Sequence, residues 1–539
     1  MTNSRETNIG RLDGGLFDTL IVGGGINGAV SAASLAGRGA SVALIDRRDF
    51  GSFTSQESSN LVWGGFKYLE GYELLLVRKL CVSRNRLTKA YPYNIKPIPF
   101  LASLGDESPY SPLLAVLGAT AYWGIGSFKT HRPRRLSAKK IKRVEPVIDV
   151  TNVRGGIEYY DAYLNDNDSR FVFSFVRSAM DVGAAVANYV EMVSADWTPE
   201  GWVVALRDRE AGDREFMCRA RTIVNATGPF IGDIGQDLGL SPDHRIVYSK
   251  GIHLIVPQIT DSERVLAFFD DTGRLFYVIP MGGRSVIGTT DTRVDEPHTH
   301  VEDEDRRFLL DQINARLDLD KPLTTEDIIA ERCGVRPLVV EIDGSDQKDT
   351  DWTKLSRKHV IEVDEDRPSV SIFGGKLTDC LNVGEEVAEA VERLGITLKP
   401  DRQEWYGEPD AATRHAYFRQ STLMKLDDLR SGRDVEPLSD RLWRRYGTRA
   451  FEMLTRVSAD PSMGQPIMAN ADYLRVELEV AADTEMITRL SDFMRRRSKI
   501  SQVVYDEQMK DSPGLLEAAQ ILFGDAAEAR IEQYWEEKV

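Results

Sequence analysis

The segment Gly23-Gly24-Gly25-Ile26-Asn27-Gly28 decides the fold. It has the spacing GxGxxG and lies between an expected strand, Asp18–Val22, and an alanine-rich helix that leads to a second expected strand, Ser41–Asp46. In such a βαβ unit the glycines permit a tight turn and the close approach of a pyrophosphate to the backbone. Asp46 follows at the distance where a carboxylate can bind ribose hydroxyls. The pattern predicts a dinucleotide site rather than a glycine turn without a ligand, and leaves FAD and NAD open.

Three further segments favour FAD. A long polar loop over 47–65 supplies hydroxyls and then two glycines, and the turn over 225–229 follows another expected strand. A third turn, over 373–378, precedes a helix expected to begin near Asn382, whose positive end would face a flavin ring. The residues expected to contact FAD are Gly23, Gly25, Ile26, Asn27, Gly28, Asp46, Thr54, Ser55, Ser59, Gly64, Gly65, Ala226, Gly228, Gly375, Lys376, Leu377 and Thr378.

Composition narrows the class of protein. A net charge of -16 argues against a nucleic-acid-binding surface, while leaving room for a local basic pocket. The four cysteines form no CxxC pair and the histidines show no metal-ligand spacing, so neither a disulfide framework nor a metal site is expected. This cysteine usage favours a reducing cytoplasm.

A length of 539 residues predicts two or three domains. Short alternating strands are expected over 191–207, 219–225 and 251–289, and the chain beyond about Pro400 has helical periodicity. The expected fold class is α/β: a Rossmann-type FAD-binding domain, a mixed-sheet substrate domain and an all-helical C-terminal domain. We expect the FAD-binding domain at 17–75, 150–245 and 330–395, the substrate domain at 76–149 and 246–329, and the helical domain at 400–539.

Two further segments carry expectations about the surface. The longest apolar run, Leu113–Gly126, is too short for the roughly 20 residues of a membrane-spanning helix. Burial in the core is expected, with a shallow membrane contact through Tyr122 and Trp123 as the alternative. The run Arg495-Arg496-Arg497 is expected on a solvated helix face, with anionic lipid or another subunit as the alternative contact.

The motifs together resemble the FAD-dependent glycerol-3-phosphate dehydrogenases, which are related to the glycerophosphate oxidases and, more distantly, to the amino-acid oxidases. The resemblance covers Asp18 to Gly384 and continues more weakly through the C-terminal helices. The segments that carry it are 58–70 (SSNLVWGGFKYLE), 225–229 (NATGP), 250–253 (KGIH), 287–291 (IGTTD), 334–338 (GVRPL) and 373–378 (FGGKLT).

The resemblance implies oxidation of glycerol 3-phosphate by hydride transfer to FAD. It also implies peripheral membrane association, on the inner face of the plasma membrane, with electrons passed to a quinone. Glycerophosphate oxidases use oxygen instead, and the residues leave the acceptor open. The residues also leave open whether the protein forms a homodimer.

Six residues carry the expected chemistry. His253, in the family's Lys-Gly-Ile-His segment, is the candidate base, since imidazole titrates near neutral pH. Arg336 resembles the family's active-site arginine, which can hold the hydroxyl oxygen or the phosphate. The expected substrate-binding residues are Lys67, Tyr68, Arg357 and Lys376.

The sequence departs from the family beside the expected flavin. Trp63 stands where the family has His, Lys67 replaces an Arg, and Asn60 replaces a Lys. Asp379-Cys380 stands where Thr-Tyr-Arg is common, and the segment from Asp161 to Arg170 is two residues longer than usual. These changes keep two alternatives open: another polyol phosphate as the substrate of a dehydrogenase or oxidase, or a catalytically silent flavin-binding protein.

Overall fold

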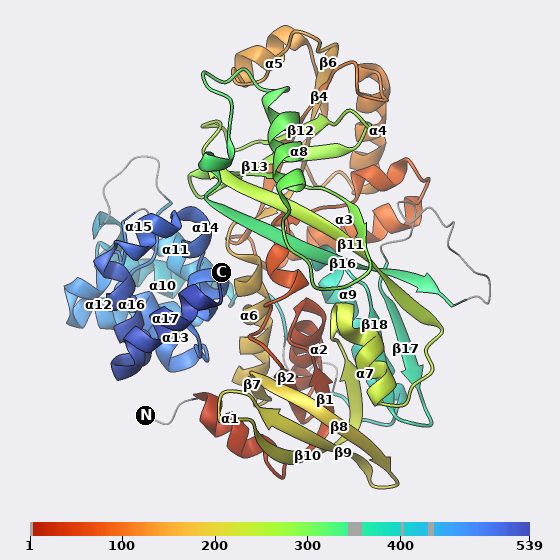
Figure 1. The fold of residues 1–539 in the computed structure, drawn as a ribbon, viewed down its shortest axis with the longest axis vertical. Coiled ribbons are helices and arrows are strands. Elements are labelled where there is room, and N and C mark those ends of the chain that lie inside the picture. The colour runs from red at the N-terminus through yellow and green to blue at the C-terminus, as the bar shows by residue number, and fades with distance from the viewer. Residues whose placement is uncertain (1–3, 343–357, 400–403, 430–435, 470, 539) are drawn as a thin grey trace.

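The computed structural model describes residues 4–342, 358–399, 404–429, 436–469 and 471–538. Two sheets with their covering helices form one body, and a group of helices from the C-terminal part of the chain lies beside it (Figure 1). This arrangement confirms the expected α/β fold class with a helical C-terminal domain.

The first sheet, sheet A, is built on the expected βαβ unit. β1 (Leu16–Val22) pairs in parallel with β2 (Val42–Asp46) and with β10 (Arg214–Asn225), and α2 (Ile26–Gly37) connects β1 to β2. Because Val22 is in register with Asn225, the glycine turn after β1 lies beside the turn that follows β10. The order of the sheet is β17-β18-β10-β1-β2-β7, with β8 and β9 continuing from β10. The remaining strands are β7 (Ala185–Asn188), β8 (Val190–Thr198), β9 (Gly201–Asp208), β17 (Val360–Asp364) and β18 (Ser369–Phe373).

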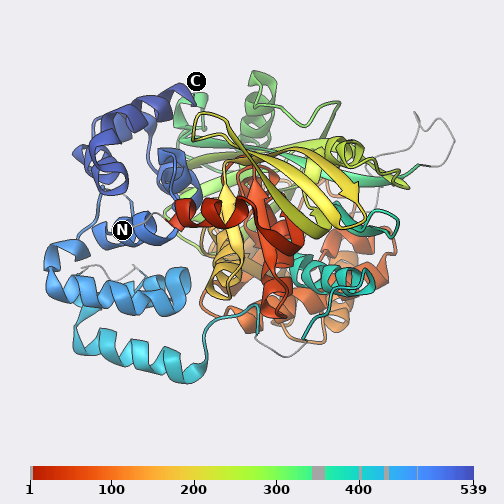
Figure 2. The same cartoon turned by 90° about the horizontal axis from the view of Figure 1, so that it is seen from below.

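Helices cover one face of sheet A. α2 packs between α6 (Asp168–Asp181) and α9 (Cys380–Arg393), and its alanine face is buried, which allows the helices to lie close to the sheet. On the other face, α1 (Ser4–Leu12) and the strands β8 and β9 enclose a second apolar cluster (Figure 2). The glycine turn is therefore held between two packed layers at the edge where the parallel strands end.

Sheet B contains ten strands in a mixed arrangement. Its longest pairing joins β11 (His244–Pro257) and β16 (Ala330–Glu341) in an antiparallel ladder. α8 (Asp303–Asn314) packs against β11 and β14. The other strands are β3 (Leu61–Val62), β4 (Ile95–Leu104), β5 (Arg134–Leu136), β6 (Gly155–Leu164), β12 (Val265–Phe269), β13 (Leu275–Met281), β14 (Arg284–Gly288) and β15 (Thr292–Val294).

The strand pairing cuts across the domain ranges expected from the sequence. β3, β6 and β16 fall inside the ranges assigned to the FAD-binding domain, yet all three pair within sheet B. The chain thus crosses between the two sheets more often than the local patterns indicate. The division into domains remains a prediction.

The apolar run Leu113–Gly126 forms α4 (Pro112–Ile125), but its burial in the core was a wrong expectation. Leu113, Leu114 and Leu117 are each more than half exposed. Tyr122 is instead buried, and its hydroxyl donates to Asp161 at 2.7 Å, so it is not available for the alternative membrane contact. One face of α4 packs inward, while its leucines lie on the opposite, exposed face.

The C-terminal helices form a separate cluster, and the arginine run joins them to sheet A. Arg496 and Arg497 are buried rather than solvated, which corrects the expectation of an exposed helix face. Arg497 holds both carboxylate oxygens of Asp49, at 2.8 and 3.0 Å, and Arg496 contacts the same carboxylate at 2.7 Å. The helices are α10 (Ala411–Leu423), α11 (Leu438–Tyr446), α12 (Ala450–Ala459), α13 (Arg475–Thr484), α14 (Ile500–Val503), α15 (Asp506–Lys510), α16 (Pro513–Phe523) and α17 (Ala527–Glu536).

Candidate active site

The glycine turn after β1 is shaped so that only glycine fits at its critical positions. Gly23 has a φ of +103°, and a Cβ there would lie 2.7 Å from the carbonyl oxygen of Ala226. A Cβ on Gly28 would lie 1.8 Å from the carbonyl oxygen of Gly23. α2 begins directly after Gly25, so its first N–H groups face the turn, as an anion-binding helix N-terminus requires.

Polar groups surround this turn. The Asp46 carboxylate accepts hydrogen bonds from the backbone N–H of Gly24 at 2.7 Å and of Arg48 at 2.8 Å, and burial raises its pKa to about 6. Ser55 Oγ accepts from the N–H of Ile26 at 3.0 Å. Thr54 Oγ1 donates to the carbonyl of Val335. Of the loop hydroxyls expected to contact a dinucleotide, Ser55 therefore reaches the glycine turn, whereas Thr54 contacts β16.

The third glycine segment closes on the same turn. Asn27 Nδ2 donates to the carbonyl of Gly374 at 2.9 Å, and Gly374 and Gly375 both have positive φ. The helix expected near Asn382 is α9, which begins at Cys380 after a short 3₁₀ turn, Leu377–Asp379. On the other side, Gly228 begins a 3₁₀ turn with a φ of +60°.

The two segments expected on either side of a flavin are adjacent. The N–H of Trp63 donates to Thr378 Oγ1 at 3.1 Å, and Lys376 Nζ lies 3.9 Å from the centre of the Tyr68 ring. The Trp63 and Tyr68 rings are 5.8 Å apart. The side chain of Lys67, in contrast, is exposed. Ser59 is partly buried, and Arg357 lies outside the described residues.

A buried acid that the sequence did not single out as a site residue anchors the Gly64 loop. Asp161 is fully buried and accepts from the N–H of Gly64 at 3.1 Å, from Arg84 Nη1 at 2.7 Å and from the Tyr122 hydroxyl. Arg170, nine residues later, pairs instead with Glu485 of the C-terminal helices at 2.8 Å. The long spacing from Asp161 to Arg170 thus connects two separate ion pairs.

The antiparallel ladder of β11 and β16 places the catalytic candidates on one face. In this ladder His253 is opposite Arg332, and Ser249 is opposite Arg336. Arg336 Nη2 donates to Thr289 Oγ1 at 2.7 Å, and Nη1 lies 3.3 Å from an oxygen of Asp291. A Cβ on Gly251 would lie 2.0 Å from Arg336 Nη2, so this glycine makes room for the guanidinium.

His253 is the unusual group on this face. It is 3% exposed, and neither ring nitrogen has a hydrogen-bond partner within the described part of the chain. Burial, followed by the charges of Arg332 and Arg336, lowers its pKa well below the usual range. The ring is therefore neutral at pH 7 and carries one nitrogen that can accept a proton.

Arg332 is a residue that sequence reasoning missed. It is buried, donates from Nη1 to the carbonyl of Ser58 and to Asn60 Oδ1, and donates from Nη2 to Gln502 Oε1 at 3.1 Å. It thereby joins sheet B to the polar loop and to the C-terminal helices. No local pattern identifies it, because its place beside His253 depends on strand register.

The departure at Asp379 is also part of a polar network. His359 Nδ1 lies 3.0 Å from Asp379 Oδ2, and Nε2 lies 2.8 Å from Glu386 Oε2. Burial disfavours the charged ring, but these carboxylates raise the pKa of His359. Among the residues that the structure describes, no group of three or more His, Cys, Asp or Glu side chains is arranged to hold a metal ion.

Comparisons with known proteins identify the family to which this site belongs. The model of the FAD dependent oxidoreductase family matches residues 18–353, and that of the C-terminal domain of alpha-glycerophosphate oxidase matches residues 429–524. Glycerol-3-phosphate dehydrogenase 2 of Mycobacterium tuberculosis is 31% identical over 492 residues, which cover 90% of this chain and 81% of the relative. The chain belongs to the FAD-dependent glycerol-3-phosphate dehydrogenase family.

Other members extend the comparison. The aerobic glycerol-3-phosphate dehydrogenase of Bacillus subtilis is 28% identical over 502 residues, which cover 89% of this chain and 87% of the relative. The solved structure of the glycerol-3-phosphate dehydrogenase from Bacillus halodurans, complexed with FAD, superposes with a TM-score of 0.74 at 23% identity. It covers 99% of this chain and 97% of that one, so the fold is shared along the whole length.

The residues present fit FAD, the cofactor of this family. The glycine cradle has no room for side chains, the N-terminus of α2 faces the glycine turn, and Asp46 is held at the end of β2. The Gly64 and Gly375 segments meet through the Trp63–Thr378 hydrogen bond. The family thus confirms the expected cofactor and an oxidoreductase that acts on a CH–OH group.

Proposed function

We propose that this protein oxidises the secondary hydroxyl of glycerol 3-phosphate to the ketone of dihydroxyacetone phosphate. The observation that carries the proposal is the buried ring of His253, whose nitrogens have no partner in the described part of the chain, on the same face of the β11–β16 ladder as Arg336. Family members in Mycobacterium tuberculosis and Bacillus subtilis carry the name glycerol-3-phosphate dehydrogenase, which supports the same substrate.

Each residue would contribute one part of the chemistry. Removal of a hydride from carbon must be accompanied by loss of the hydroxyl proton, and His253 is the group that would accept this proton. Arg336 would hold the oxygen from which the proton leaves, since its charge is permanent and its donors lie in a fixed plane. Lys376 and Tyr68, which contact each other, would bind the anionic end of the substrate. When bound, FAD supplies the acceptor for the hydride.

Trp63 and Lys67 motivate a second candidate within the same chemistry, another polyol phosphate. The Trp63 ring lies 5.8 Å from Tyr68, so its bulk borders the proposed substrate position. Lys67 is exposed and offers a point charge in place of a planar fork. A changed pocket boundary would alter the preferred length of the substrate without removing the base.

Anaerobic reduction of the bound flavin tests the proposal directly. The purified yellow protein is expected to lose its flavin absorbance on addition of glycerol 3-phosphate, and to keep it with unphosphorylated glycerol as the matched control. If a tetritol phosphate bleaches the flavin and glycerol 3-phosphate does not, the substrate is the longer polyol phosphate. A flavin that dithionite reduces but no polyol phosphate reduces would show a silent flavin-binding protein and end the proposal.

We also propose that the protein is cytoplasmic and passes electrons to a quinone at a membrane surface. The contact would involve the α3–α4 surface, defined as the exposed apolar side chains of α3 (Leu74–Ala90), α4 and their flanking residues: Tyr72, Leu74, Leu75, Leu113, Leu114, Leu117 and Phe128. Arg78 donates to the carbonyl of Ile125, which ties the two helices together. No helix of the described residues is both long and apolar enough to cross a bilayer.

Charge supports the same assignment. Lys129, Arg132 and Arg135 follow α4 and are exposed, in a chain whose net charge is -16. A cluster of apolar and basic side chains is the combination that binds the interface of an anionic membrane. The surface lies next to the proposed active site, because α3 supplies Arg84 to the Asp161 anchor of the Gly64 loop.

Replacing Leu75 and Leu117 with serine is expected to weaken binding to vesicles of anionic lipid. Burial of a leucine contributes about 1.5–3 kcal/mol, so the pair should reduce partitioning by at least tenfold. The measurement is co-sedimentation, and flavin reduction by substrate should be unchanged. The matched control is Leu423→Ser, an exposed leucine of α10. Equal sedimentation of all three proteins would assign the contact to another surface.

A further inference from the structure

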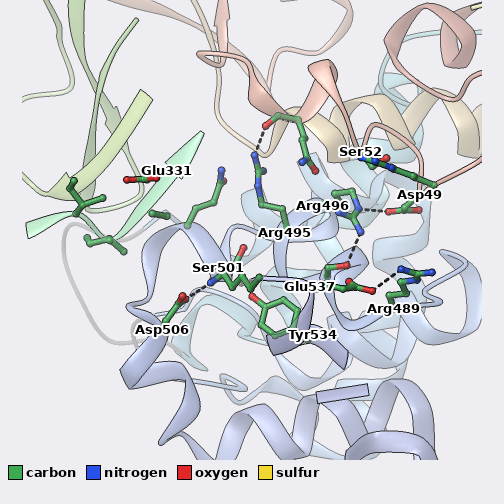
Figure 3. Close-up of a pocket in the computed structure, with 18 of the residues that line it drawn as sticks. Asp49, Ser52, Glu331, Arg489, Arg495, Arg496, Ser501, Asp506, Tyr534 and Glu537 are labelled. Carbon is green, nitrogen blue, oxygen red and sulfur yellow. Dashed lines mark hydrogen bonds and ion pairs between the residues drawn. The ribbon is translucent and has the colours of Figure 1, made fainter. Parts of the chain in front are cut away.

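A large cavity lies where the C-terminal helices meet the two sheets (Figure 3). Its volume is about 1540 Å³, and it is lined by the turn after β2, by α8 and the start of β16, and by residues of the C-terminal helices. In Figure 3 Arg495 and Arg496 point from the C-terminal part toward the loop that carries Asp49 and Ser52. The cavity shares part of the loop over 47–65 with the expected cofactor site, but its lining does not include the glycine turn, Asp46, His253 or Arg336, so it is distinct from the proposed active site.

The walls of this cavity are basic. Nine of the lining residues are arginine or lysine and five are aspartate or glutamate, in a chain that carries an excess of acid overall. Several of these cations are neutralised: Arg489 pairs with Glu210, and Arg496 pairs with Asp49. Three others, Arg47, Arg48 and Arg307, form no ion pair with the described part of the chain, although Arg47 lies over the Phe230 ring at 4.0 Å and Arg307 donates to the carbonyl of Asp303.

Arg47 and Arg48 are neighbours in the turn after β2, and Arg307 lines the same cavity from α8. Arg48 is exposed to the cavity, and its pKa is lowered by partial burial and by the charges of Arg47, Arg209 and Arg496. Like charges held together around an open space are destabilising unless an anion enters it. The arrangement therefore favours a ligand that carries several negative charges.

Buried donors point the same way. Gln502 is 1% exposed and lines the cavity; its Oε1 accepts from Arg332, but its Nε2 has no acceptor among the described residues. Arg495 Nη1 is likewise without an acceptor in this part of the chain. Buried donors are normally satisfied, so each of these groups indicates a place for an oxygen of a ligand.

We propose that this cavity binds an organic or inorganic polyphosphate. The phosphoryl oxygens would be held by Arg47, Arg48 and Arg307, and by the Gln502 amide. Ligand pockets usually measure about 300–1,000 Å³, so this one is too large for a single phosphate. The site is additional to the one that oxidises the substrate, and its occupancy does not depend on which polyol phosphate is used.

Titration calorimetry of the flavin-loaded protein with tripolyphosphate tests the site. Binding is expected at low ionic strength, and the affinity should fall as salt is added because the contacts are charged. The double variant Arg48→Ser/Arg307→Ser should bind at least tenfold more weakly. Both side chains are exposed, so the variant is expected to fold and to retain its flavin.

The matched control removes two arginines elsewhere. Arg393→Ser/Arg419→Ser changes the net charge equally at two exposed positions outside the cavity, and should bind like the unaltered protein. ATP in place of tripolyphosphate separates the two sources of the ligand: tighter binding of ATP would show that a nucleotide is recognised, and equal binding that the phosphates suffice. Equal affinities of all three proteins, no binding to the unaltered protein, or release of FAD by the added phosphate would each overturn the proposal.

Discussion

Replacing His253 with glutamine is expected to lower the rate of flavin reduction by polyol phosphate about 10²–10⁴-fold, the usual contribution of a general base. Glutamine fills similar space but cannot accept a proton at neutral pH. The flavin should remain bound, because neither ring nitrogen of His253 has a hydrogen-bond partner in the described part of the chain, so no cofactor-binding segment is hydrogen-bonded to the ring. Single-turnover reduction of the flavin is the measurement.

The pH dependence of this step follows from the lowered pKa of His253. The neutral ring is the form that accepts a proton, and burial with Arg332 and Arg336 keeps it neutral well below pH 6.5. The rate of flavin reduction should therefore not fall between pH 8 and 6.5 through protonation of His253. His244→Gln, on the same strand, is the matched control and should keep its activity. A His253→Gln protein as fast as its control would remove His253 from the mechanism.

The second large effect concerns the attachment of the C-terminal helices. Asp49→Asn is expected to lower the free energy of unfolding by about 3–5 kcal/mol, because it leaves buried arginines without their counter-charge. Asp49 and Arg497 are both fully buried and share two hydrogen bonds. The measurement is thermal and urea unfolding. The control is Asp506→Asn, whose exposed partner Lys538 should make the change cost less than about 1 kcal/mol.

The effect of Asp49 also has a defined pH window. Burial opposes ionisation, but Arg497 and Arg496 hold the pKa of Asp49 below its usual value. A depressed folded pKa means that the stabilisation is complete above the unfolded value, near 4, and is lost as the pH falls further. The difference in stability between the Asp49→Asn variant and the unaltered protein should therefore shrink in acid. A constant difference down to pH 3 would contradict this account.

The parts of the fold predicted from the sequence are those encoded locally. The glycine turn, Asp46 and the alanine face of α2 follow from spacing within one βαβ unit, and the structure places them as expected. The burial of α4 could not be predicted, because an apolar run does not indicate which face of a helix packs against the rest of the protein. Its leucines are exposed although the run is uniformly apolar.

The rest depends on contacts between distant residues. Arg495-Arg496-Arg497 has the composition of a solvated helix face, and only the presence of Asp49, 448 positions from Arg497, makes it a buried connection. Arg332 was missed because its position beside His253 is set by the register of β11 and β16. The roles of His253, Arg336 and Lys376 remain predictions until the variants are measured.

The ion pair between Asp49 and Arg497 has a consequence for biosynthesis. Translation proceeds at about 5–20 residues per second, so the ribosome adds Arg497 roughly 20–90 s after Asp49. Throughout that interval the nascent βαβ unit carries an acid whose final counter-ion does not yet exist. The βαβ unit can fold early, but the turn that carries Asp49 acquires its final surroundings only when synthesis is nearly complete.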